Sequence, residues 1–182
     1  MHYLIGIAVR ARDQDEAIDE AKDFFKSNLL NQYGIDYGSI YSDVAGAYSD
    51  VAELNAIDCT ATPLSSPNSE GQYIGRDFAD YLVETTENIF RENINKIREF
   101  LATKSDDDLW DDGVSMDRYN LHEAGAYGGG SIRLYDAKWG GGIRSQWDYD
   151  KVKENWSPWN TFEDTEDQND IPYWIVPMDI HI

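Results

Sequence analysis

The segments suited to β-strands lie at the two ends of this chain, and the segments with helical periodicity lie between them. Residues 3–9 and 171–182 are apolar runs, whereas residues 77–104 carry apolar side chains at helical spacing. Strands and helices that are segregated in this way are typical of an α+β fold. We therefore expect one acidic α+β domain over residues 1–182, with a mostly antiparallel sheet packed against a layer of helices. The N-terminal strand, three C-terminal strands and one long amphipathic helix make up this expected fold.

The first helix is predicted directly after the N-terminal strand. Asp13 is suited to cap it, because its carboxylate can accept a hydrogen bond from the free N–H groups of the first turn, and Glu16 follows three residues later. Apolar residues then recur at helical spacing, and Gly34 is suited to the left-handed residue that ends many helices. Further on, residues 41–52 repeat Tyr-Ser-Asp-Val-Ala at a period of seven, which is compatible with a short helix.

The longest helix is expected over residues 77–104, after a loop over residues 63–75 that is rich in proline, serine and glycine. Ser105 and the aspartates that follow it predict the cap and acidic first turn of another short helix. The apolar stripe of the long helix consists of Phe78, Leu82, Ile89, Phe90, Ile94, Ile97 and Leu101.

The C-terminal half is rich in glycine and tryptophan from about residue 125 onward. Glycine triplets on either side of residues 131–137 predict a strand with tight turns, and residues 143–149 are expected to be its hairpin partner. Residues 171–182 predict a last strand that could pair with the first. Pro172 and Pro177 cannot donate ladder hydrogen bonds, so an edge position or a bulge is expected for it.

The formal net charge of the chain is −20, and it is distributed over both halves of the sequence. Residues 1–105 hold 18 acids and 9 bases, and residues 106–182 hold 17 acids and 6 bases. Such a chain repels nucleic acids and anionic membranes, and it favours a basic protein surface as its partner. The densest acid clusters, and hence the expected partner-binding face, are Asp106, Asp107, Asp108, Asp111, Asp112, Glu163, Asp164, Glu166, Asp167 and Asp170.

The six tryptophans all lie after residue 109, which leaves two interpretations open. They could fill the core of an irregular, glycine-rich half, or some of them could be exposed in an interface. Trp156-Ser-Pro-Trp159 has the form of a rigid turn that presents two indoles, so Trp156 and Trp159 are the candidate interface aromatics.

No motif for catalysis, metal binding or cofactor binding stands out. Neither His122 nor Cys59 has neighbours that would make it a general base or an activated nucleophile. The glycine clusters lack the spacing of phosphate-binding loops. Residues 164–170 resemble part of a calcium loop, but the glycine at its sixth position and the glutamate at its twelfth are missing. We therefore assign no catalytic residue, no metal and no cofactor.

The function class favoured by these features is a non-enzymatic protein that binds a basic protein surface. In its sharper form, the hypothesis is a nucleic-acid mimic of the kind that viruses and mobile elements carry. Such a mimic inhibits a DNA- or RNA-binding defence protein. A housekeeping domain of a halophile, whose acidity is a salt adaptation, is one alternative. A hydrolase that uses paired carboxylates and a divalent metal is the other. The N-terminus lacks signal-peptide features and no run is apolar enough to cross a bilayer, so a cytoplasmic protein without membrane contact is expected.

Overall fold

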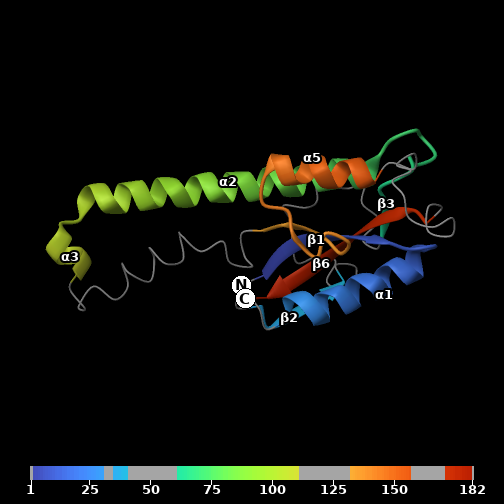
Figure 1. The fold of residues 1–182 in the computed structure, drawn as a ribbon, viewed down its shortest axis with the longest axis horizontal. Helices are drawn as coiled ribbons and strands as arrows, with labels where there is room; N and C mark the ends of the chain where they lie inside the picture. The colour runs from blue at the N-terminus through green and yellow to red at the C-terminus, as the bar shows by residue number, and fades with distance from the viewer. Residues whose placement is uncertain (1, 31–34, 41–60, 111–131, 157–170, 182) are drawn as a thin grey trace.

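The computed structural model describes residues 2–30, 35–40, 61–110, 132–156 and 171–181, and it confirms the α+β class. A mostly antiparallel sheet and one long helix dominate the arrangement (Figure 1). The strands are β1 (His2–Arg10), β2 (Tyr37–Ile40), β3 (Thr62–Pro63), β4 (Leu134–Asp136), β5 (Gly141–Gly142) and β6 (Tyr173–His181). The helices are α1 (Gln14–Phe24), the π-helical turn η1 (Phe25–Leu29), α2 (Ile74–Thr103), α3 (Asp106–Trp110) and α5 (Gln146–Asn155).

The two terminal strands pair with each other at the centre of the sheet. The strand order is β2-β6-β1-β4-β5, and β3 also pairs with β6. β1 and β6 run antiparallel over nine residue pairs, from His2 opposite His181 to Arg10 opposite Tyr173. β4 lies parallel to β1 on the other side. The predicted pairing of the chain ends is therefore confirmed.

β6 is a central strand, and the prediction that its prolines confine it to an edge is wrong. Pro177 lies opposite Gly6 of β1. The Gly6 N–H donates to the Arg133 carbonyl oxygen on the β4 side, so this pair exchanges no hydrogen bond between β1 and β6. The nitrogen of Pro177 consequently points to the other side of β6. There the pairing with β3 ends at Ile175 and the pairing with β2 begins at Met178, so no ladder hydrogen bond is lost.

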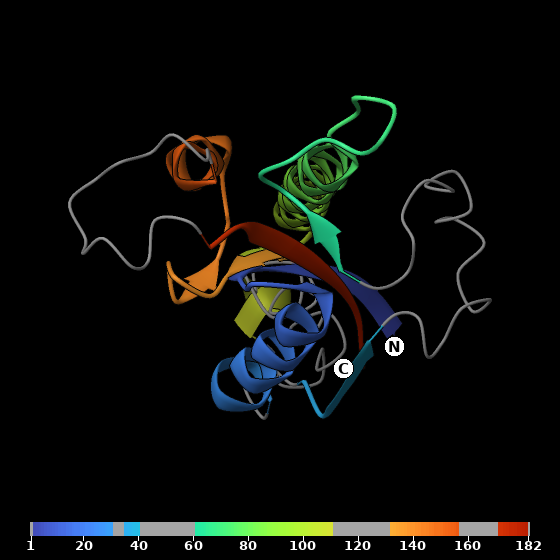
Figure 2. The ribbon, with the colours of Figure 1, turned by 90° about the vertical axis from the view of Figure 1, so that its right-hand side faces the viewer.

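Helices cover both faces of the sheet, whereas the sequence led us to expect one helical layer. Figure 2 shows α1 on one face and α2 and α5 on the other. Each face of the sheet has its own hydrophobic core, and alternate residues of β1 pack into one or the other. Ile5, Ile7 and Val9 pack with α1, and Ala8 packs with α2 and α5. Because β1 and β6 are apolar on both faces, each face needs a cover. At Gly6 the approach of α2 is especially close, since a Cβ there would lie 2.5 Å from the Leu82 side chain.

α1 begins as predicted. The Asp13 carboxylate accepts a hydrogen bond from the Glu16 N–H at 2.9 Å, and Glu16 in turn accepts from the Arg12 N–H at 2.6 Å. The helix then widens into η1, where the Leu30 N–H donates to the Phe25 carbonyl oxygen at 2.9 Å. None of the sequence features that we used predicts this π-helical turn. Gly34, the predicted end of the helix, lies outside the described residues.

In the described structure, the fully buried residues of α2 all lie in its first half. Its buried residues are Gly75, Phe78, Ala79, Leu82, Val83 and Thr86. Toward its C-terminal end the helix extends past the sheet to α3 (Figure 1). The predicted apolar stripe continues along this second half, and there Phe90 is 40% and Leu101 53% exposed.

The predicted hairpin after β4 is shorter than expected, because the chain turns into a helix. β5 comprises two glycines, and the prediction that residues 143–149 form a strand is wrong. Ser145 has extended backbone angles, and its hydroxyl accepts a hydrogen bond from the Asp148 N–H at 3.2 Å, which caps α5. The repeat within residues 41–52 lies outside the described residues. Of the described helices, none is long and apolar enough to cross a membrane.

Candidate functional site

The predicted acidic face begins on α3, where Asp106, Asp107 and Asp108 are all exposed. Asp108 is committed to the helix cap. Its carboxylate accepts hydrogen bonds from the hydroxyl and the N–H of Ser105, at 2.7 and 3.1 Å. The Ser105 hydroxyl is the main reason why the pKa of Asp108 lies below its usual value. Asp106 and Asp107 are therefore the exposed carboxylates of α3 that lie outside this cap.

Most of the other predicted site residues lie outside the part of the chain that the structure describes. This applies to the acid clusters after α3 and α5 and to one of the two candidate interface aromatics. They are Asp111, Asp112, Glu163, Asp164, Glu166, Asp167, Asp170 and Trp159.

Trp156 belongs to the core, so its assignment as an interface aromatic is wrong. Its side chain is fully buried at the end of α5, with its ring edge-on to Tyr149 at a centroid distance of 5.7 Å. The indole N–H donates to Asp136 Oδ2 at 3.0 Å. A buried indole needs a hydrogen-bond acceptor, and Asp136 supplies it. The alternative interpretation of core packing is correct for this tryptophan.

Asp136 is a buried carboxylate that the sequence analysis did not single out. It is 2% exposed, and burial raises its pKa, while hydrogen bonds from Trp156 and from backbone N–H groups oppose this shift. One of these donors is the Trp139 N–H, at 2.8 Å from Oδ1. A carboxyl group with a raised pKa can serve as a catalytic acid or base when it faces a cleft. Asp136 instead faces the interior and ties β4 to α5.

A second acidic surface, on α1, was missed in the sequence because we considered its first acids only as a helix cap. Asp15, Asp19 and Asp23 recur every four residues, and all three are exposed, as is Glu20. They form one row on the solvent side of the helix, since residues four apart lie on the same face. A search for acids at this spacing could have found the row. In Figure 1, α1 and α3 lie toward opposite ends of the long axis, so these are two separate acidic surfaces.

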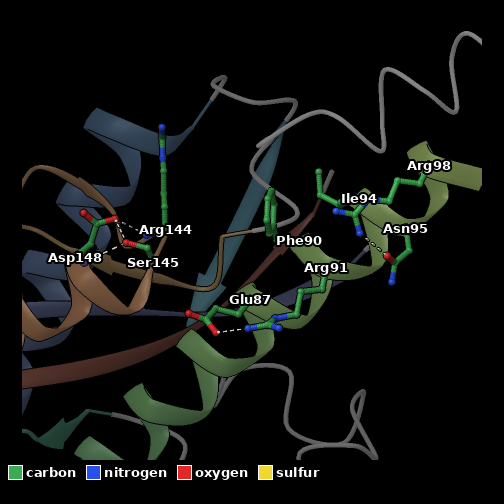
Figure 3. Close-up of a pocket in the computed structure, with 9 residues that line it drawn as sticks. All are labelled: Glu87, Phe90, Arg91, Ile94, Asn95, Arg98, Arg144, Ser145 and Asp148. Carbon is green, nitrogen blue, oxygen red and sulfur yellow. Dashed lines mark hydrogen bonds and ion pairs between the residues drawn. The ribbon is translucent and has the colours of Figure 1, made fainter. Parts of the chain in front are cut away.

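A cleft of the described structure lies between α2 and the start of α5 (Figure 3). Its volume is about 830 Å³, and its nine lining residues include three arginines: Arg91, Arg98 and Arg144. Arg91 pairs with Glu87 at 3.6 Å. None of the nine lining residues is a histidine, cysteine or lysine. The cleft therefore offers cations and an apolar wall, and the one hydroxyl among these nine residues, on Ser145, donates to Asp148 at 3.0 Å as part of the cap of α5.

Among the described residues, no group of three or more histidine, cysteine, aspartate or glutamate side chains is placed to hold a metal ion. His122 and Cys59 lie outside the described residues.

Comparison with known proteins yields a family without an assigned activity. Residues 1–182 match the model of a domain of unknown function, DUF7995. The chain belongs to this family. It matches no curated protein and no solved structure.

Proposed function

We propose that this protein acts by binding, and that it presents exposed carboxylates to a basic protein surface. The observation that carries the proposal is the row formed by Asp15, Asp19 and Asp23 on α1. Like charges four residues apart destabilise a helix by about 0.2–0.5 kcal/mol per pair. Packing of the opposite face of α1 against the sheet offsets this cost. Within α1 the repulsion is offset only in part, by the helix dipole at Asp15 in the first turn and by the ion pair of Asp23 with Lys26 at 3.9 Å. A basic partner surface would offset the rest.

The sharper form of the proposal is nucleic-acid mimicry. Asp15, Asp19, Glu20 and Asp23 place four carboxylates along about 12 Å of helix, or one per about 4 Å. One DNA strand carries a phosphate every ~3.4 Å along its axis. A cleft that binds a DNA backbone would therefore meet a similar charge density on α1. A protein of the kind that viruses carry would use this surface to inhibit a DNA- or RNA-binding defence protein. This role implies a cytoplasmic location.

The test compares two variants that have the same net charge. D15N/D19N/D23N removes the row on α1, whereas E84Q/E92Q/E99Q removes three exposed acids from α2. Binding is measured by calorimetry against a panel of purified nucleases and DNA-packaging proteins with basic DNA-binding clefts. For the panel member that binds, we expect the α1 variant to weaken binding about tenfold or more, and the α2 variant to change it less than about twofold. Excess duplex DNA should compete with the native protein.

Three results would contradict the proposal. Equal weakening by both variants would show that net charge alone matters, and not the row on α1. Undiminished binding in excess DNA would exclude mimicry. Absence of binding across the panel, together with unfolding of the native chain at low salt, would make the acidity a salt adaptation.

A further inference from the structure

Arg98 on α2 and Arg144, just before α5, are two arginines in a chain whose net charge is −20. Within the described part of the chain, no carboxylate lies within ion-pair distance of the Arg98 or Arg144 guanidinium. Arg98 Nη1 donates a hydrogen bond to the neutral Asn95 Oδ1, at 3.4 Å. Both arginines are exposed, and both line the same cleft (Figure 3).

The two carboxylates of the cleft are already engaged. Glu87 pairs with Arg91 on the same helix. Asp148 accepts hydrogen bonds from the Ser145 hydroxyl at 3.0 Å and from the Arg144 N–H at 3.3 Å, as part of the cap of α5. The cleft therefore offers two available guanidiniums to an anionic partner.

An apolar seam runs beside these arginines. Ile94, Ile97 and Leu101 are spaced by three and four residues, which is the spacing of the contact positions in a coiled coil. Ile94 and Ile97 are partly buried, and Leu101 is 53% exposed. The seam formed by these three residues extends over about 10 Å of α2, and Ile94 also lines the cleft.

We infer that this seam and cleft bind an amphipathic helix of a partner protein whose flanking residues are acidic. The seam spacing suits a helical partner, because knobs from a second helix fit between contact residues repeated in this way. Arg98 follows Ile97 and flanks the seam, at the position where a helical partner would place an acid. This binding mode goes beyond the proposed function, since it requires a partner surface of the opposite charge.

A second copy of this chain fits the seam poorly. In an antiparallel pair of α2 helices, the arginine-bearing sides of the two seams would face each other. Two chains that each carry a charge of −20 also repel one another. An acidic amphipathic helix would place carboxylates, and not arginines, opposite the arginine-bearing side of the seam.

The probe is a fluorescein-labelled helix of three heptads with leucine at the contact positions and glutamate at the flanking positions. It is titrated with the full chain in an anisotropy assay, at a peptide concentration too low for self-association. A second peptide carries lysine in place of glutamate. The protein variants are R98E/R144E, its charge-matched control K26E/K151E, and L101D, all at exposed positions.

We expect R98E/R144E and L101D to weaken binding of the glutamate peptide about tenfold or more, and K26E/K151E to change it less than about threefold. The lysine peptide should depend on the acids of α1, so D15N/D19N/D23N should weaken it while R98E/R144E should not. This separation distinguishes a failure of the present inference from a failure of the proposed function.

The inference is overturned if the glutamate peptide does not bind the native chain, or if R98E/R144E and K26E/K151E weaken it equally. Sedimentation equilibrium that reveals a dimer broken by L101D would also overturn it, because a second copy would then cover the seam.

Discussion

Replacement of Trp156 by phenylalanine tests the buried hydrogen bond that joins α5 to the sheet. Phenylalanine keeps an aromatic ring beside Tyr149 but cannot donate to Asp136. Because both partners of the lost bond are buried, water cannot readily replace the indole N–H. The substitution therefore leaves a buried carboxylate with one donor fewer.

The expected loss of stability has two parts. A hydrogen bond to a charged group contributes about 1.5–3 kcal/mol. The smaller ring leaves volume unfilled, which costs about 1–2 kcal/mol more. The sum is about 2.5–5 kcal/mol, a large share of the 5–15 kcal/mol that is typical of a folded protein. For a chain of this size the melting temperature should fall by about 10 °C.

The assay is urea unfolding followed by circular dichroism at about pH 7.5, with W147F as the control. Trp147 is 66% exposed, so its replacement should change the free energy of unfolding by less than about 0.5 kcal/mol. A loss below about 1 kcal/mol for W156F would refute our account of this contact.

The same variant should depend on pH in a defined direction. Burial raises the pKa of Asp136 above 3.8, so its ionised form costs stability, and this cost is fully present only above the folded-state pKa. The Trp156 hydrogen bond favours the ionised form, and its removal raises the pKa further. The penalty of W156F should therefore shrink as the pH falls through the folded-state pKa. A penalty that grows as the pH is lowered would contradict this assignment.

Two further substitutions test contacts of α2. Thr86 accepts a hydrogen bond from the buried Arg133 N–H at 3.0 Å. T86V should therefore lower the free energy of unfolding in urea by about 1–3 kcal/mol and speed hydrogen exchange at the Arg133 amide. Unchanged exchange would refute the contact. A Cβ at Gly75 would lie 2.4 Å from the Pro63 carbonyl oxygen, so G75A should cost about 1–3 kcal/mol. G141A, with no atom within 4 Å of the added Cβ, is its control, and equal effects of the two would show that the close approach is absent.

The elements that the sequence predicted well are those with a local signal. β1 is a compact apolar run, α1 has Asp13 as its cap, and the apolar residues of α2 recur at helical spacing. Each of these signals lies within the element itself. The short helix α3 was also predicted from its cap, Ser105.

The failures follow from partners that are distant in the chain or from a signal that we overlooked. The burial of Trp156 depends on Asp136, twenty residues earlier, and the central place of β6 depends on where β2 and β3 stop along it. Neither can be derived from local periodicity. α5 was different, because Ser145 and Asp148 form a local capping pattern that we passed over for a hairpin.

The placement of β6 has a consequence for how the molecule is made. Each of its nine pairs with β1 joins residues at least 163 positions apart in the chain. Because β6 follows every other described element, a ribosome releases it last, and until then β1 lacks the neighbour that lies beside it along its whole length. Such long-range pairing is intrinsically slow. During synthesis the apolar faces of β1 and α1 therefore stay exposed to chaperones or to other chains until β6 pairs with β1 and completes the sheet.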